Sequence, residues 1–508
     1  MTALQPVQRR DSQHNLPMAH TPQNKKRISL TTSLLAVVVG IVAKLSLTKG
    51  DLLPGLDGAF YWVQVRSVLE NMSLAFSDLP LVFWVQAGIA WVVGDVPLGV
   101  RISDAVLPAL SAIPIYLIAK RFRNPFLPAI AISVVLLHPI QLYFFTGDFI
   151  KNEATIPAVF FMALVLVNWE TRSKKLSVIY LIILFVITAL SHFGTALLAF
   201  ILIVLWGLLQ MRKSGLKFWL KGISLSVLAF VSLLASLAII VPNRYERLVE
   251  FITTPSAIFV RPVIDGIIHG YANSIITFTI ITSQIAVVVL AIISWRSRSN
   301  FSFSDMSLVI ASLIATFIFS LPFISMEWAD RLTGLSFVPL SVAAILIFGN
   351  ADKNLYKAPV TLLAVMTLIS SISFTSYEMK VVFSEDKYAE FKQLVKQVEI
   401  PENSVIVARH GVQYLSAWHF ETDVVLESYF ETADLSSYSA VFILAENRTS
   451  EKKEDVPNPS GDSNDDKTKL SMPSGDKAPD NGGKEINPQE LTGQTVYGNE
   501  SFTLVRIR

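Results

Sequence analysis

The most constraining feature of the chain is a series of long apolar stretches, each close to the length of a membrane-crossing helix. A helix needs about 20 mostly apolar residues to cross a bilayer, because the lipid core offers backbone groups no partners outside the helix. With tilt and boundary error allowed, about eleven stretches qualify: residues 29–47, 100–119, 125–138, 152–169, 176–191, 194–210, 216–241, 273–294, 305–325, 331–348 and 357–375. We therefore expect a polytopic α-helical membrane protein, with a transmembrane domain over residues 29–375.

The composition excludes several other classes of protein. Only 16% of the 508 residues are charged, whereas soluble domains carry about 25%, so a water-soluble multidomain enzyme is excluded. A net charge of +2 argues against nucleic acid as a partner, because proteins that bind it carry strongly basic surfaces. The chain has no cysteine, which excludes disulfides, thiol nucleophiles and thiolate metal sites.

The arrangement of basic residues predicts how the chain crosses the lipid bilayer. Residues 1–28 are polar and end in Lys25, Lys26 and Arg27 directly before the first apolar stretch, which is typical of an uncleaved signal anchor with a cytoplasmic N-terminus. Alternating the spans from there brings every basic loop to the cytoplasmic side: residues 120–123, 172–175, 212–213, 296–298 and 353–357. The positive-inside rule therefore predicts a multi-pass protein of the cell membrane whose C-terminal domain is extracytoplasmic.

The first extracytoplasmic loop, residues 48–99, is expected to contain two interfacial helices. Between residues 59 and 71 the apolar residues share one helical face and the polar residues lie opposite, as in a helix that lies along a membrane surface. The apolar face consists of Tyr61, Trp62, Val65, Val68 and Leu69. Residues 80–94 are apolar but, at about 15 residues, too short for a span. Counting them as a span would invert every later loop and break the positive-inside rule.

The composition turns polar after the last span, and residues 376–508 are predicted to form a small extracytoplasmic α/β domain. Periodic and β-branched runs predict one helix and several strands, at residues 387–398, 404–409, 423–428 and 439–445, with a final hairpin that turns at Gly498-Asn499. An insertion at 449–492 lacks large apolar residues and is expected to be disordered. Aromatic and basic residues of this domain suit either acceptor binding or core packing: Arg409, His410, Tyr414, Trp418 and His419.

Ionisable residues outside the cytoplasmic loops gather at the extracytoplasmic ends of the predicted spans. Charges are tolerated at any helix end, which is the simpler explanation for each residue taken alone. Taken together, the residues suit a binding site. Cations of the later loops would bind an anionic headgroup, and an acid of the first loop beside them would act as a general base. The candidate site residues are Asp57, Asp148, Lys151, His192, Arg261, Glu327 and Arg331.

Two of the cations each have a second interpretation as members of an ion pair. Lys151 begins a span whose N-terminal dipole favours a phosphate, or it pairs with Asp148 while its stem lies against apolar surface. Arg331 suits phosphate oxygens through its forked guanidinium, or it pairs with Glu327 at helical spacing.

His192 and Arg261 are equally open. His192 lies at the outer turn between two spans, where it either donates to a phosphate or sugar or serves the structure alone. Arg261 borders a proline-containing loop that either gates a lipid donor or contacts lipid headgroups.

The first loop carries the residues of a family resemblance. The run Leu53-Pro-Gly-Leu-Asp-Gly-Ala-Phe-Tyr-Trp62, followed by Asp78-Leu-Pro-Leu, resembles the GT-C superfamily of integral-membrane glycosyltransferases. The branch in question includes the protein mannosyltransferases and the lipid A aminoarabinose transferases. The resemblance covers the transmembrane domain and extends to the acidic residue after the first span, the interfacial helices and the many spans.

The resemblance implies a polyprenyl-phosphate-linked sugar as donor, an extracytoplasmic glycan, lipid or protein as acceptor, and Asp57 as the general base. From the residues alone, Asp57 is also a suitable N-cap for a helix that starts at Gly58. Protein mannosyltransferases have an acidic pair at this point, whereas Gly58 follows Asp57 here. The Trp-Trp-Asp motif of the oligosaccharyltransferases is absent from the sequence.

Metal dependence and two other functions stay open at the level of sequence. The reaction requires no cofactor, although Asp57, Asp148 and Glu327 are suitable ligands for a divalent cation. A secondary transporter is one alternative, but transporters usually show internal repeats and charges near the membrane midplane, and the sequence shows neither clearly. A polymerase or ligase that uses a polyprenyl-diphosphate-linked glycan differs mainly in its donor, which the sequence does not distinguish.

Overall fold

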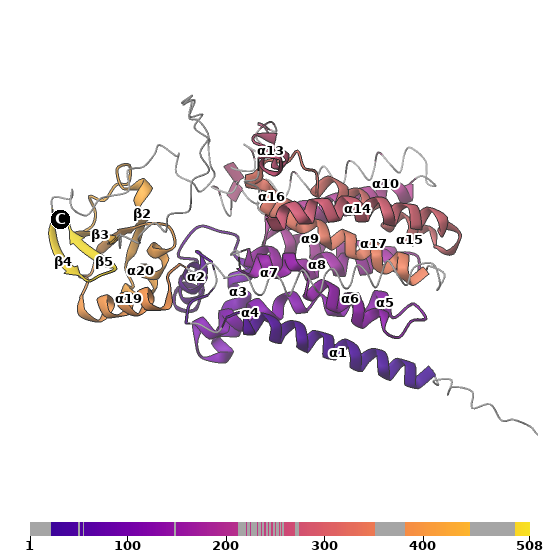
Figure 1. Ribbon diagram of the computed structural model, residues 1–508, viewed down its shortest axis with the longest axis horizontal. Coiled ribbons are helices and arrows are strands. Elements are labelled where there is room, and N and C mark those ends of the chain that lie inside the picture. The colour runs from indigo at the N-terminus through magenta and orange to yellow at the C-terminus, as the bar shows by residue number, and fades with distance from the viewer. Residues whose placement is uncertain are drawn as a thin grey trace, which may run out of the picture.

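The computed structural model describes residues 22–48, 51–53, 55–146, 149–211, 259–269, 274–350, 382–447 and 493–508, together with scattered positions between 220 and 256. Within these residues, the molecule consists of a long helical bundle and a small sheet domain that meets one end of the bundle (Figure 1). We call this end of the bundle the domain end.

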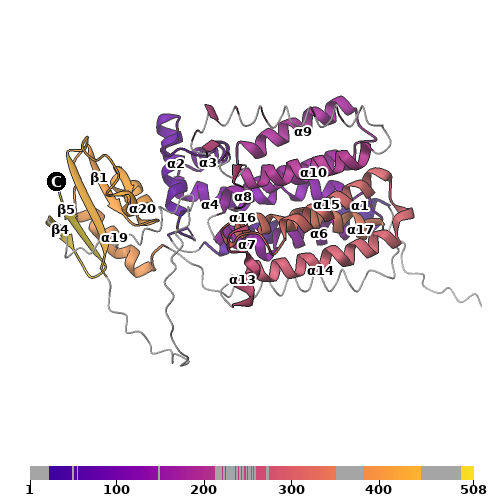
Figure 2. The same cartoon turned by 90° about the horizontal axis from the view of Figure 1, so that it is seen from above.

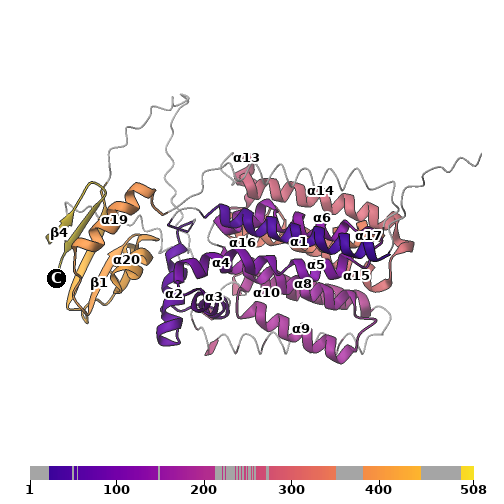
Figure 3. The ribbon, with the colours of Figure 1, turned by 90° about the horizontal axis from the view of Figure 1, so that it is seen from below.

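The bundle confirms the predicted polytopic α-helical fold. Among the described residues, seven helical segments are long and apolar enough to cross a membrane, the first being Gln23–Ser46 and the last Thr333–Asn350. Figures 2 and 3 show the bundle helices running side by side. They are α1 (Pro22–Ser46), α4 (Val96–Ala109), α5 (Ala112–Ala119), α6 (Leu127–Leu136), α7 (Pro139–Thr146), α8 (Ile150–Val167), α9 (Lys174–Ala189), α10 (Phe193–Met211), α14 (Ser274–Arg296), α15 (Phe303–Phe319) and α17 (Phe337–Asn350). The predicted spans 216–241 and 357–375 lie largely or wholly outside the described residues.

Prolines interrupt two of the seven membrane-length segments, Val96–Ala119 and Leu127–Phe145. α4 and α5 are separated at Leu110 and Ser111, because Pro114 has no N–H to donate to the Leu110 carbonyl. At the break, the Ser111 N–H donates to the Pro108 carbonyl over 3.0 Å. This three-residue spacing is that of a 3₁₀ turn, which is wound more tightly than an α-helix. The separation of α6 from α7 likewise falls directly before Pro139, since the residue before a proline avoids helical geometry.

α8 lies at the centre of the bundle. It contacts α4, α5, α7, α9, α10, α15 and α17, and nearly all of its side chains are buried. Its first turn, which carries Lys151 and Glu153, faces the first loop and the end of α1. The most enclosed helix of the bundle therefore begins beside the predicted functional loop.

Two helices form in the first loop at about the predicted positions, and they lie between the bundle and the domain. They are α2 (Gly58–Asn71) and α3 (Leu81–Val93), and Figure 1 shows α2 next to the domain. The polar side of α2 is not simply exposed. Gln64 is fully buried, because its amide exchanges two hydrogen bonds of 2.9 and 3.0 Å with the backbone of Phe76.

The C-terminal part of the chain folds into the predicted small α/β domain. Its elements are α19 (Glu385–Gln397), β1 (Ser404–Ala408), α20 (Val412–Phe420), β2 (Asp423–Leu426), β3 (Ala440–Glu446), β4 (Gln494–Gly498) and β5 (Phe502–Arg506). The strand order is β2-β1-β3-β5-β4, with β1 parallel to β2 and β3, and β5 antiparallel to β3 and β4. The predicted start of the domain near residue 376 and the insertion at 449–492 lie outside the described residues.

One apolar core joins the domain to the first loop. Side chains alternate across the sheet, so that one face carries residues such as Phe442 and Leu504, and these pack in the same cluster as Phe391 of α19, Val65 of α2 and Phe83 of α3. The opposite face of the sheet has its own smaller apolar cluster. The domain is therefore packed against the loop that carries Asp57 through buried apolar side chains.

Candidate functional site

Asp57 occupies the N-cap position of α2, but its side chain makes no capping hydrogen bond. Its carboxylate points instead toward the C-terminal domain, where Oδ1 lies 3.0 Å from Nε2 of His410. The side chain is 36% exposed, so a substrate can reach it. The structure thus gives Asp57 the backbone position of a cap and leaves its carboxylate for contacts outside the helix.

A short turn before α20 delivers His410 to this position. Gly411 has φ +85°, and a Cβ on it would lie only 3.0 Å from the carbonyl oxygen of Leu56, so glycine allows the two backbones to approach. Arg409 holds the other side of the turn with hydrogen bonds to the carbonyls of His410 (3.0 Å) and Val382 (3.2 Å). The sequence run Arg409-His410-Gly411 is therefore a contact point between the domain and the first loop.

Lys151 forms an ion pair with Asp78 of the first loop. Asp78 is almost fully buried, and the ammonium also lies 5.5 Å and 6.0 Å from the ring centres of Phe83 and Phe60, within the range of a cation–π contact. Asp148, the predicted partner, lies outside the described residues. The first-loop motif Asp78-Leu-Pro-Leu includes this aspartate, but it lies 73 residues from Lys151. The sequence therefore did not indicate that the two residues form an ion pair.

Aromatic side chains connect the Asp57 and Lys151 positions. Phe60 follows Asp57 by three residues on α2, one turn along the same side, and its ring centre lies 5.7 Å from that of Phe83 and 5.1 Å from that of Tyr414. Because Lys151 and His410 lie next to these same rings, the carboxylate and the ammonium occupy one neighbourhood. We call Asp57, His410, Phe60, Lys151 and Asp78 the Asp57 site.

His192 lies near this site but acts as a helix cap. Its Nδ1 accepts from the Thr195 N–H at 3.2 Å and lies 3.0 Å from Thr195 Oγ1, at the start of α10. Thr195 Oγ1 in turn lies 2.9 Å from Thr155 Oγ1, and the Thr155 hydroxyl donates to the Lys151 carbonyl at 3.0 Å. His192 is thus linked through Thr195 and Thr155 to the Lys151 carbonyl, and its role toward a phosphate or sugar stays a prediction.

Arg261, Glu327 and Arg331 belong to a separate unit at the domain end. The unit contains α13 (Val263–Ile268), α16 (Met326–Leu332) and the short helix η3 (Thr333–Ser336), and Figure 1 shows α13 next to α16. The Met326 N–H donates to the Arg261 carbonyl at 3.2 Å, which brings Arg261 beside the start of α16. Arg261 and Arg331 are exposed, whereas the side chain of Glu327 is outside the described part of the structure.

A buried ion pair near the start of α8 was not predicted. Lys44, in the last turn of α1, pairs with Glu153, and both side chains are at most 2% exposed. The Lys44 ammonium also donates to Oε1 of Gln141 at 3.3 Å. Charges inside a bundle are costly and usually occur in pairs, but the single Lys44 within an apolar stretch did not reveal its partner.

No metal centre is visible in the described part of the chain. Within those residues, no three His, Cys, Asp or Glu side chains gather closely enough to hold a metal ion. Because Asp148 and the side chain of Glu327 lie outside that part, the divalent cation stays a prediction.

Comparison with known proteins identifies the fold. No protein-family model and no curated protein matches the chain. Among solved structures, ArnT from Cupriavidus metallidurans superposes in its apo state with a TM-score of 0.54, at 11% identity over 94% of this chain and 97% of ArnT. ArnT bound to undecaprenyl phosphate gives a TM-score of 0.53, at 11% identity over 94% of this chain and 98% of ArnT.

An apo oligosaccharyltransferase from Archaeoglobus fulgidus also matches, with a TM-score of 0.48 and 12% identity over 82% of this chain and 69% of the other. The chain shares the fold of ArnT, so the predicted resemblance is confirmed at the level of the fold.

Proposed function

We propose that the protein is a membrane glycosyltransferase that moves a sugar from a polyprenyl-phosphate donor to an extracytoplasmic acceptor. The observation that carries the proposal is the Asp57 site, where a carboxylate and an ammonium share one aromatic neighbourhood at the domain end. Its support from the fold is the likeness to ArnT over 94% of the chain, including ArnT in complex with undecaprenyl phosphate. In this proposal the N-terminus is cytoplasmic and the domain end is extracytoplasmic.

The reaction has two requirements that these residues meet. A bond forms between the acceptor oxygen and the anomeric carbon while the bond from that carbon to the phosphate oxygen breaks. Asp57 accepts the proton of the acceptor hydroxyl, as a general base within hydrogen-bond reach. Lys151 stabilises the negative charge of the departing lipid phosphate, an electrostatic contribution that is strong where water is excluded.

His410 supports Asp57 as a positioning residue. Its Nε2 lies 3.0 Å from Oδ1 of Asp57, and its ring is placed by the glycine turn and by Tyr414, whose ring centre lies 5.9 Å away. A carboxylate held from one side keeps its other oxygen directed at the acceptor. The C-terminal domain therefore supplies part of the catalytic geometry.

The remaining predicted residues belong to donor binding in this proposal. Arg261 and Arg331 are exposed cations at the domain end, where they suit the phosphate or the lipid headgroups around the donor. In sequence, Glu327 lies four residues before Arg331, and Asp148 lies three residues before Lys151. His192 acts indirectly by fixing the start of α10 beside Lys151.

An Asp57→Asn variant tests the proposal. It should lose at least about 99% of sugar transfer from a labelled polyprenyl-phosphate sugar in purified membranes, since removing a general base costs about 10²–10⁴-fold. The matched control is Asp434→Asn. Asp434 is an exposed carboxylate of the sheet domain, and it accepts a hydrogen bond of 3.0 Å from the N–H of Ser436, two residues away in sequence. Transfer at the normal rate by Asp57→Asn would remove Asp57 as the base, and the absence of any transfer by the unchanged protein would remove the proposed function.

A further inference from the structure

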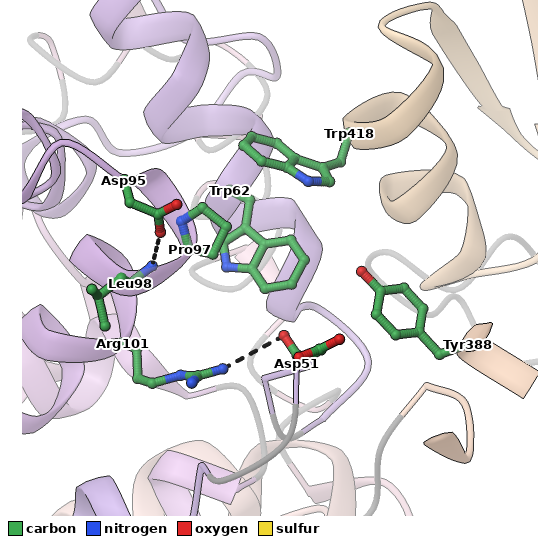
Figure 4. Close-up of a pocket in the computed structure, with 8 residues that line it drawn as sticks. All are labelled: Asp51, Trp62, Asp95, Pro97, Leu98, Arg101, Tyr388 and Trp418. Carbon is green, nitrogen blue, oxygen red and sulfur yellow. Dashed lines mark hydrogen bonds between the residues drawn. The ribbon is translucent and has the colours of Figure 1, made fainter. Parts of the chain in front are cut away.

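A cavity of about 290 Å³ lies where the first loop, α4 and the C-terminal domain meet. Figure 4 shows side chains of the bundle part and of the domain facing one another across it. Three aromatic and three charged residues form its main walls: Trp62, Tyr388, Trp418, Asp51, Asp95 and Arg101. Two of these, Tyr388 and Trp418, come from the C-terminal domain, so the cavity exists only when the domain is packed against the first loop.

The cavity is distinct from the Asp57 site because α2 separates the two. Trp62 follows Phe60 by two residues, which places it about 200° further round the helix. Phe60 accordingly faces Tyr414, with ring centres 5.1 Å apart, whereas Trp62 faces Trp418, with ring centres 5.7 Å apart. Along α2, Trp62 lies about 7.5 Å from Asp57 at the helical rise of 1.5 Å per residue.

The aromatic walls suit the apolar face of a sugar ring. Trp418 is held in place by Arg66, whose guanidinium stacks on it at 4.7 Å, and Tyr388 is held by a 3.0 Å hydrogen bond to Nε2 of His419. Trp62 is 2% exposed, and within the described residues its indole N–H donates to no acceptor. The indole nitrogen is closed to solvent, so Trp62 forms the back of the wall and offers a ligand contact with its ring carbons only.

The polar groups of the cavity balance in charge. Asp51 is neutralised by Lys392, whose Nζ donates to it at 2.7 Å and holds the pKa of Asp51 below its ordinary value. Asp95 accepts from the Leu98 N–H at 2.7 Å, and Arg101 supplies a positive charge on the same wall. Together with the Lys392 ammonium, the two carboxylates and the guanidinium sum to about zero net charge, which favours a ligand with many hydroxyls and no net charge.

We propose that this cavity binds one neutral sugar ring of the acceptor glycan, beyond the unit that receives the transferred sugar. The inference rests on the proposed glycosyltransferase function and names the chemistry of its acceptor. The volume of about 290 Å³ lies near the lower limit of ligand pockets, which is about 300 Å³, and so suits a single ring rather than a long chain. Along the helix axis the cavity lies only about 7.5 Å from Asp57, and in this proposal the bound ring and the reacting unit belong to one glycan that passes around α2.

A binding experiment on the full-length protein in lipid nanodiscs, free of sugar detergents, tests the proposal. The probes are short neutral gluco-, manno- and galacto-oligosaccharides, with an oligogalacturonate as the charged comparison, followed by saturation-transfer NMR and tryptophan fluorescence. Leu98→Trp places a bulky ring in the cavity from a side chain that is 45% exposed, and Leu110→Trp is the matched control on the same helix segment, at 42% exposure. Leu98→Trp should weaken binding about tenfold or more, while Leu110→Trp should leave it unchanged.

The outcomes separate this proposal from the proposed function. Binding of none of the neutral oligosaccharides, equal binding by Leu98→Trp, or equal binding of the oligogalacturonate would overturn the cavity's role. Sugar transfer without oligosaccharide binding would contradict the cavity alone, and oligosaccharide binding without any transfer would contradict the proposed function alone.

Discussion

At the scale of single residues, the contact between Asp57 and His410 is the least expected feature of the protein. The two residues are far apart in sequence, and each has an ordinary local explanation, as a helix cap and as a surface histidine. The tertiary structure brings Nε2 of His410 to 3.0 Å from the Asp57 carboxylate. In the proposed reaction this contact fixes the direction in which the base points.

A pair of substitutions at His410 tests the contact. His410→Ala should lower the rate of sugar transfer about 10–100-fold, because it removes the imidazole that lies 3.0 Å from the Asp57 carboxylate and a base displaced by about 1 Å can lose about 10²-fold in rate. His410→Gln keeps an N–H donor of similar reach, and we expect it to recover much of the rate at unchanged KM for the donor. Equal losses in both variants, with a matching loss of folded protein, would show that His410 serves only the packing of the domain.

At the scale of elements, α2 is the helix that joins the two parts of the molecule. The amphipathic pattern correctly predicted the helix, and its apolar residues Trp62, Val65 and Val68 are buried. The pattern could not show that Arg66, on the polar side, donates at 2.8 Å to the carbonyls of both Ala417 and Trp418. Periodicity identifies which residues share a face, but what covers a polar face depends on a partner distant in sequence.

Arg66→Ala should therefore loosen the C-terminal domain. Losing the two hydrogen bonds of a guanidinium that is 16% exposed should lower the free energy of local opening of α20 by about 1.5–3 kcal/mol. Hydrogen–deuterium exchange of α20 peptides measures this directly. Arg298→Ala is the control, since Arg298 also stacks on a tryptophan, Trp295, at 4.8 Å, yet it lies outside the domain contact. Equal exchange of α20 in both variants would contradict the assigned role of Arg66.

At the scale of the whole molecule, the bundle end and the domain share one buried core, so conditions that loosen the domain also act on the Asp57 site. His419 lies within this contact. Burial, and then the nearby charges of Lys392 and Arg66, lower its pKa to about 4. Neutral His419 accepts the hydrogen bond of Tyr388, whose pKa is raised to about 12 by burial and by Asp51.

The packing of the domain should weaken as the pH falls from about 6.5 to about 4. In that window the unfolded domain binds a proton on His419 that the folded domain does not bind, so stability present above pH 6.5 is progressively lost. Thermal unfolding of the full-length protein at pH 7.5 and pH 4.5 should show a smaller pH effect in His419→Gln. His269→Gln on α13 serves as the control, and an identical pH effect in all three proteins would refute this linkage.

The orientation of the molecule is open to a direct test, because the chain has no cysteine. Ser173 precedes α9 and Ser436 lies in the sheet domain, and both are exposed. In intact cells, an impermeant thiol reagent should label Ser436→Cys and spare Ser173→Cys, as the positive-inside rule requires. Labelling in the opposite pattern would place the domain in the cytoplasm and with it the proposed site.

The sequence by itself determined the class of the protein, most of its helices and the strands of the small domain. Those features follow from local periodicity and from the length that a bilayer demands. The family resemblance of the first loop selected Asp57, and a cation at the outer start of an apolar span selected Lys151.

The tertiary structure alone decided which partners these residues have: His410 for Asp57, Asp78 for Lys151 and Glu153 for Lys44. It also decided that the polar side of α2, which carries Arg66, is covered by the C-terminal domain. The physical reason is that such contacts join segments hundreds of residues apart or on different helices, and no local pattern in the chain encodes their meeting.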